Sequence, residues 1–113
     1  MLDTIAREPL WRHLINYRCG TGHSVSFVGN VHEGPHSLNG RNTTLMRPGM
    51  IVTDEPGVYE TDLVGIRIEN ELVCVHKADN QYGTFLGFEP LMSCPLPPLP
   101  SCPVCWIRTR SHG

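Results

Sequence analysis

The strongest constraint on the fold is the β-strand pattern that runs from Val64 to Lys77, where apolar residues first alternate with glycine, arginine and glutamate. Successive side chains of a strand point to opposite faces of a sheet. Ile66 and Ile68 are therefore expected on one face, and Arg67 and Glu69 on the other. We expect the apolar face to pack on a core and the polar face to present a cation and a carboxylate side by side.

Other elements follow from periodicity and turn signals. Further strands are expected at residues 50–53 and 83–91. Apolar residues between positions 2 and 15 recur near the helical period, while Pro9 predicts two short helices or a kink. Residues 18–36 are rich in Gly, Ser and His and predict a loop with short extended pieces. The expected class is α+β.

Length and charge exclude several kinds of partner. At 113 residues the chain is one small domain or a piece of one, and its net charge of −2 gives no basis for binding nucleic acid. The sequence contains neither an apolar run of membrane-spanning length nor a basic cluster suited to a membrane surface. Asp3 and Glu8 interrupt any secretory-signal pattern at the N-terminus. We therefore expect a cytoplasmic protein with no membrane partner.

Candidate site residues lie beside turns and glycines. His23 follows a Gly-Thr-Gly run, where the backbone can approach a site closely. Glu55 precedes Pro56, which favours an extended backbone at the glutamate. Imidazole and carboxylate groups are suitable ligands for a divalent metal. On spacing alone, a loop histidine and a turn carboxylate without a metal remain the simpler interpretation, and Glu69 is equally compatible with a solvated partner of Arg67.

Four motifs that occur in a fixed order favour the metal-ligand interpretation instead. Together they resemble the C-terminal part of Xaa-Pro aminopeptidases (aminopeptidase P), metallopeptidases with the pita-bread fold. The resemblance extends from Leu2 to about Cys94. Its motifs are Leu-Asp-Thr-Ile-Ala-Arg-Glu-Pro-Leu-Trp at 2–11, Gly-Thr-Gly-His at 20–23 with Val-His-Glu-Gly-Pro at 31–35, Asp-Glu-Pro-Gly at 54–57 and Gly-Ile-Arg-Ile-Glu-Asn at 65–70.

The resemblance implies a fold and an activity. Residues 1–94 would be a C-terminal fragment of the catalytic domain, the second half of a pita-bread (creatinase/aminopeptidase) fold with a curved antiparallel sheet and flanking helices. The parent enzyme would hydrolyse peptides with proline in the second position and would be a homodimer. It would use two divalent metal ions, manganese in the first place, with cobalt or zinc possible at such N/O sites.

The resemblance also implies roles for single residues. His23, Glu55 and Glu69 would bind metal, so we expect their ligand atoms to lie about 3–6 Å apart. Glu55 would in addition act as general base. His32 would contact the tetrahedral intermediate without binding metal, and Arg67 would order the site. For His32 the alternative from the sequence alone is an ordinary surface histidine.

Several departures from the family pattern predict that the chain is inactive by itself. Cys19 stands where the family commonly has histidine, and Ser24 and Ser26 replace glycines. The family needs two metal-binding aspartates upstream of the histidine, but only Asp3 precedes His23. The alternatives are a non-catalytic binding or regulatory module on the same fold, or a prolidase-type dipeptidase. The Val31–Pro35 motif favours aminopeptidase P over prolidase.

The last part of the chain has a different composition. Five of the ten prolines fall between Pro95 and Pro103. We expect residues 95–113 to form a poorly ordered tail, and favour a sequence of frameshift or splicing origin over a polyproline II ligand. The five cysteines are expected to be reduced thiols. A structural zinc site usually needs two more ligands at suitable spacing. Cys94 and His112 are present, but no ordered scaffold is expected around them, so we interpret Cys102 and Cys105 as a chance pair rather than a zinc site.

Overall fold

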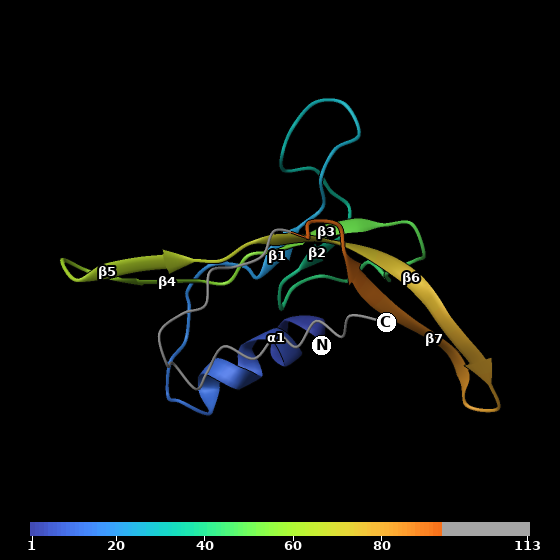
Figure 1. Cartoon of the computed structure of the whole chain (residues 1–113), viewed down its shortest axis with the longest axis horizontal. Coiled ribbons are helices and arrows are strands. Elements are labelled where there is room, and N and C mark those ends of the chain that lie inside the picture. The colour runs from blue at the N-terminus through green and yellow to red at the C-terminus, as the bar shows by residue number, and fades with distance from the viewer. Residues whose placement is uncertain (94–113) are drawn as a thin grey trace.

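The computed structural model describes residues 1–93, which form one helix and seven strands. The tail at 95–113, with its proline run and its cysteine pair, lies outside the described residues. The elements are α1 (Leu2–Trp11), β1 (Gly22–His23), β2 (Ser37–Leu38), β3 (Ile51–Asp54), β4 (Gly57–Glu60), β5 (Val64–Arg67), β6 (Asn70–Asn80) and β7 (Gly83–Pro90) (Figure 1).

The strands form three small antiparallel sheets with the orders β1-β2, β3-β6-β7 and β4-β5. Two hairpins extend as arms on opposite sides of the centre in Figure 1: β4-β5 on one side and β6-β7 on the other. The helix α1 lies beneath the centre, where β1, β2 and β3 contact one another (Figure 1). This arrangement confirms the α+β class and the antiparallel sheet.

The strand predicted from Val64 to Lys77 is interrupted at Ile68 and Glu69, between β5 and β6. Facing this break, Glu55 and Pro56 separate β3 from β4, a strand that the sequence patterns did not predict. Pro56 has no backbone N–H to donate, so the ladder cannot continue through it.

The register is the same on both sides of this break. Asp54 pairs with Asn70 on one side, and Gly57 pairs with Arg67 on the other. The backbone therefore sets Glu55 and Glu69 at opposite positions on the two chains.

The helix is shorter and less apolar in its packing than predicted. It is a single helix that contains Pro9 and ends at Trp11, where the chain continues in tight turns to Leu14 at φ +58°. Its one buried residue is Asp3, whereas Ile5 is 64% exposed. A polar side chain, rather than the apolar stripe expected from the periodicity, thus attaches the helix to the sheet.

The buried centre of the described residues is mostly polar. The buried hydrophobic residues are Tyr17, Leu38, Val52 and Cys74, and the buried polar residues are Asp3, Thr21, Ser24, His36, Thr53 and Glu55. The prediction that Ile66 and Ile68 pack on a core is wrong, because their side chains are 57% and 43% exposed and no described element covers that face. No helix among the described residues is long and apolar enough to span a membrane.

Candidate metal centre

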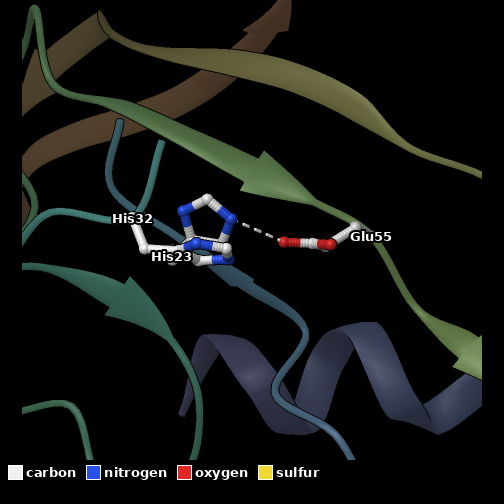
Figure 2. Close-up of side chains that lie close together, drawn as sticks. All are labelled: His23, His32 and Glu55. Carbon is white, nitrogen blue, oxygen red and sulfur yellow. Dashed lines mark ion pairs between the residues drawn. The ribbon is translucent and has the colours of Figure 1, made fainter. Parts of the chain in front are cut away.

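Three side chains from separate segments meet at the centre of the molecule. One ligand atom each of His23, His32 and Glu55 lies within 4.8 Å of the other two. His23 Nε2 is 2.8 Å from Glu55 Oε1, and the two imidazole centroids are 3.9 Å apart (Figure 2). Figure 2 shows Glu55 pointing from the segment just after β3 toward the overlapping rings.

His23 is placed by a close approach between β1 and β3. A Cβ on Gly22 would lie 1.7 Å from the carbonyl oxygen of Thr53, so only glycine permits this contact. The backbone N–H of His23 donates to Thr53 Oγ1 at 3.0 Å. His23 Nδ1 lies 3.0 Å from the carbonyl oxygen of Ser24. Because a carbonyl can only accept, Nδ1 carries the proton and Nε2 is the nitrogen that faces Glu55.

Glu55 is 8% exposed and its carboxylate has a fixed direction. Its backbone N–H donates to the carbonyl oxygen of Thr21 at 2.7 Å. The Thr53 hydroxyl donates to Oε1 at 2.9 Å, and Arg67 Nη1 donates to Oε2 at 2.8 Å. Desolvation lowers the pKa of Arg67, but the nearby Tyr59 and Glu55 outweigh it and raise that pKa above its ordinary value. Arg67 therefore stays cationic and holds one oxygen, while Oε1 faces the histidine.

A second set of polar contacts lies behind the site. Thr21 Oγ1 donates to Asp3 Oδ1 at 2.5 Å, and the Tyr17 hydroxyl lies 2.6 Å from Thr21 Oγ1. Arg7 Nε donates to Asp3 Oδ2 at 2.8 Å. Burial raises the pKa of Asp3, but the hydrogen bonds from Arg7 and Thr21 and the charge of Arg7 together hold it below its ordinary value. Asp3 thus links the helix to Thr21, whose carbonyl oxygen holds the backbone of Glu55. Both carboxylate oxygens of Asp3 already accept hydrogen bonds.

The predicted site residues do not all meet. His23 and Glu55 are in contact, and His32 and Arg67 each adjoin one of them. Glu69 is exposed and is not part of this cluster, although the strand register sets it opposite Glu55. Its role as a ligand therefore stays a prediction.

Three positioning residues, Thr53, Asp3 and Arg7, were missed by the sequence patterns. Thr53 stands two residues before Glu55, so the alternation of an extended strand puts both side chains on one face, and this signal was available. Asp3 and Arg7 have the i, i+4 spacing of a helical ion pair, but that spacing does not indicate burial.

Cys19 lies beside Arg67 at the edge of the site. Its Sγ is 3.8 Å from Arg67 Nη2 and 3.7 Å from the carbonyl oxygen of Gly57. The position at which the family commonly has histidine is thus filled by a thiol in contact with the cation that holds Glu55.

The donor set suits one divalent ion better than two. Two imidazoles and a carboxylate match the ligands of borderline metals such as zinc. A five-ligand centre for two ions would need further carboxylates. Among the described residues, Asp3 is occupied by Arg7 and Thr21, and Glu69 lies outside the cluster. The described residues therefore fit part of a two-metal site and do not complete it.

Comparison with known proteins places this geometry in context. The sequence model of metallopeptidase family M24 matches residues 1–76. Aminopeptidase P2 of Arabidopsis thaliana is 49% identical over 102 residues, which cover 85% of this chain and 14% of that protein. A probable Xaa-Pro aminopeptidase P of Coprinopsis cinerea is 43% identical over 102 residues, covering 85% of this chain and 16% of that protein.

A solved structure has the same fold. It is an X-prolyl aminopeptidase from Caenorhabditis elegans, described as a cytosolic enzyme with a di-nuclear active site. The two structures superpose with a TM-score of 0.73 at 37% identity, over 83% of this chain and 16% of the nematode chain. The described residues thus correspond to part of a pita-bread fold, and the chain spans only about a seventh of the length of these relatives.

Proposed function

The chain belongs to metallopeptidase family M24, and on that premise we propose that it is part of an Xaa-Pro aminopeptidase. Residues 1–94 would form the C-terminal part of the catalytic domain, separate from a tail at 95–113. The parent enzyme would remove the N-terminal residue that precedes a proline. The observation that carries this proposal is the 2.8 Å contact between His23 Nε2 and Glu55 Oε1.

In the parent enzyme, His23, Glu55 and Glu69 would be the ligands that this chain contributes to a pair of divalent ions, with manganese as the first choice. A cytosolic location is supported by the description of the nematode enzyme. When bound, the ions would supply an activated water and polarise the scissile carbonyl. A homodimer remains our expectation for the parent.

The residues of the chain itself would orient groups and move a proton. Arg67 holds Oε2 of Glu55, so Oε1, which faces the site and also accepts from the Thr53 hydroxyl, would take the proton of the attacking water. His32 is exposed beside His23 and would donate a hydrogen bond to the negative charge that develops on the carbonyl oxygen. We propose that the 113 residues alone are inactive, because they supply too few ligands for two ions.

A chimera provides a positive test of the proposal. Residues 1–93 would replace the matching segment of the Arabidopsis relative, and hydrolysis of an Xaa-Pro tripeptide would be measured with added manganese. We expect turnover that falls by at least about 100-fold in the Glu69→Gln and His23→Ala chimeras, because each removes a proposed ligand. The 113-residue chain would be assayed alongside and is expected to show no turnover above its own Glu69→Gln variant.

The same chimera separates the proposal from its main alternative, a non-catalytic binding module. Cys19, in contact with Arg67, is the observation that favours this alternative. A folded chimera that is inactive with Cys19 and active after Cys19→His would show that the natural sequence is a non-catalytic member. A chimera whose turnover is unaffected by Glu69→Gln would contradict the proposed ligand set.

A further inference from the structure

We propose that a hollow between α1, the segment before β1 and the turn after β2 binds the phosphoryl group of a small phosphorylated molecule. Its volume is about 500 Å³, which lies within the range of roughly 300–1,000 Å³ that is usual for small-molecule sites. Each of the three segments contributes one arginine to its lining: Arg7, Arg18 and Arg41. Among the described residues, no acidic side chain lines the hollow, and neither does any of the three residues that meet at the candidate metal centre. The inference therefore does not depend on the proposed function.

The arginines of the hollow differ in their partners. Arg7 is fixed, because its Nε donates to Asp3 Oδ2 at 2.8 Å and its Nη2 donates to the carbonyl oxygen of Cys19 at 2.7 Å. The negative charge of Asp3 offsets the positive charge of Arg7. Within residues 1–93, by contrast, neither Arg18 nor Arg41 forms an ion pair, and both are exposed. The hollow therefore presents two uncompensated positive charges to solvent.

Hydrogen bonds hold the segments that carry these two charges against each other. The backbone N–H of Thr21 donates to the carbonyl oxygen of Leu38 at 2.9 Å, which joins the segment before β1 to the end of β2. The backbone N–H of Arg41 donates to Asn39 Oδ1 at 2.8 Å, which stabilises the turn after β2. Gly20 lies against this turn, because a Cβ on Gly20 would be 3.7 Å from Asn39 Cβ. Both free guanidinium groups thus border one hollow from anchored backbone.

Two unpaired guanidinium groups suit a doubly charged oxyanion. The planar fork of arginine binds phosphate and carboxylate oxygens through paired N–H donors. A phosphate monoester carries a charge of about −1.5 to −2 at pH 7, so it can balance both arginines, whereas a carboxylate balances only one. The net charge of the whole chain is −2, so the surface outside the hollow repels a long polyanion such as a nucleic acid. The charge pattern therefore favours a single phosphoryl group.

The test is equilibrium dialysis of the metal-free full chain against radiolabelled inorganic phosphate at low ionic strength. We expect one phosphate per chain. Arg18→Gln and Arg41→Gln should each weaken binding by about 10-fold, because each removes charge-assisted hydrogen bonds. The matched control is Arg47→Gln, which removes the same charge at an exposed arginine outside the hollow and should leave the affinity unchanged. Circular dichroism would verify that all three variants keep their fold.

Competing anions at equal ionic strength identify the ligand. Displacement of phosphate by glycerol phosphate and sulfate, but not by acetate, supports the proposal. Absence of binding, binding that is insensitive to Arg18→Gln and Arg41→Gln, or an equal loss in Arg47→Gln would each overturn it. Acetate that competes as well as sulfate would overturn the assignment to a phosphoryl group. A phosphoserine peptide that binds more tightly than glycerol phosphate would assign the hollow to a protein partner and overturn the small-molecule assignment.

Discussion

The centre of the molecule buries polar residues, whereas its two hairpin arms expose apolar ones. At the centre, Thr21, Thr53 and Glu55 are 0%, 2% and 8% exposed, and their side chains are hydrogen-bonded. On the arms, Ile66 and Phe85 are 57% and 48% exposed. A protein that folds alone normally does the reverse, since burial of apolar area is its main source of stability. The difference indicates that hydrogen bonds between buried polar groups hold the centre together, whereas the arms present uncovered apolar surface.

Among the described residues, the β4-β5 arm also lacks a third strand to support it. The β4-β5 sheet has only two strands, and isolated two-stranded hairpins are marginally stable in water. Its free strand edges and apolar side chains can recruit other chains. We therefore expect the isolated chain to be weakly folded and self-associating, with the arms responsible for association and the centre for stability. The following changes test that division.

Gly22→Ala should have the largest effect. The added Cβ would lie 1.7 Å from the carbonyl oxygen of Thr53, so β1 would have to separate from β3. We expect a loss of about 3 kcal/mol or more in the free energy of unfolding, measured by urea denaturation. Gly20→Ala is the matched control, because its Cβ would meet its nearest atom at 3.7 Å. Equal unfolding midpoints for the two variants would show that the centre does not determine stability.

Thr53→Val should have the next largest effect. It removes the hydroxyl that accepts from the His23 backbone N–H and donates to Glu55, while keeping the side-chain volume. Buried partners left without a hydrogen bond predict a loss of about 2–3 kcal/mol. Thr43→Val, at an exposed position, should change stability by less than about 0.5 kcal/mol. An unchanged melting curve for Thr53→Val would contradict the importance of the polar centre.

The pH dependence of folding should report on Asp3. Its pKa in the folded chain lies below the ordinary value of 3.8, so the folded state favours the charged form. The resulting stabilisation is fully present above the ordinary pKa and is lost as pH falls through the lower, folded value. Stability measured from pH 6 downward should therefore decline in acid, and Asp3→Asn should make this decline shallower. If Asp3→Asn lost stability in acid as steeply as the wild-type chain, Asp3 would not be the source of the pH dependence.

Ile66→Thr should have the smallest effect on stability and a clear effect on association. Threonine keeps the β propensity of the strand and removes exposed apolar surface from the arm. We expect a lower apparent mass by light scattering at equal concentration, with stability changed by less than about 0.5 kcal/mol. Leu45→Thr is the control. Leu45 is an apolar loop residue that is 81% exposed, and its replacement should leave the apparent mass unchanged. A monomeric wild-type chain with a cooperative melt would contradict the role assigned to the arms.

Local patterns predicted much of the secondary structure. Alternation identified the strand around Ile66, because the period of two follows directly from strand geometry, and short apolar runs beside turn signals identified the strands around Ile51 and Phe85. The same patterns predicted one continuous strand where the structure has two, β5 and β6. The break between them, at Ile68 and Glu69, arises from Pro56 on the opposing segment. Such a cause lies outside any window around the affected residues.

The sequence by itself determined the residue types of the site. Glycine at position 22 and proline at position 56 specify a close approach and a ladder break, and the four motifs gave the family that the comparisons confirm. Only the tertiary structure decided which side chains meet. It brought the His32 ring beside that of His23 and left Glu69 exposed. Which side chains meet depends on how separate segments pack and not on their spacing along the chain. It also exposed Ile66, since an alternating pattern specifies that a strand has an apolar face but not whether anything covers that face.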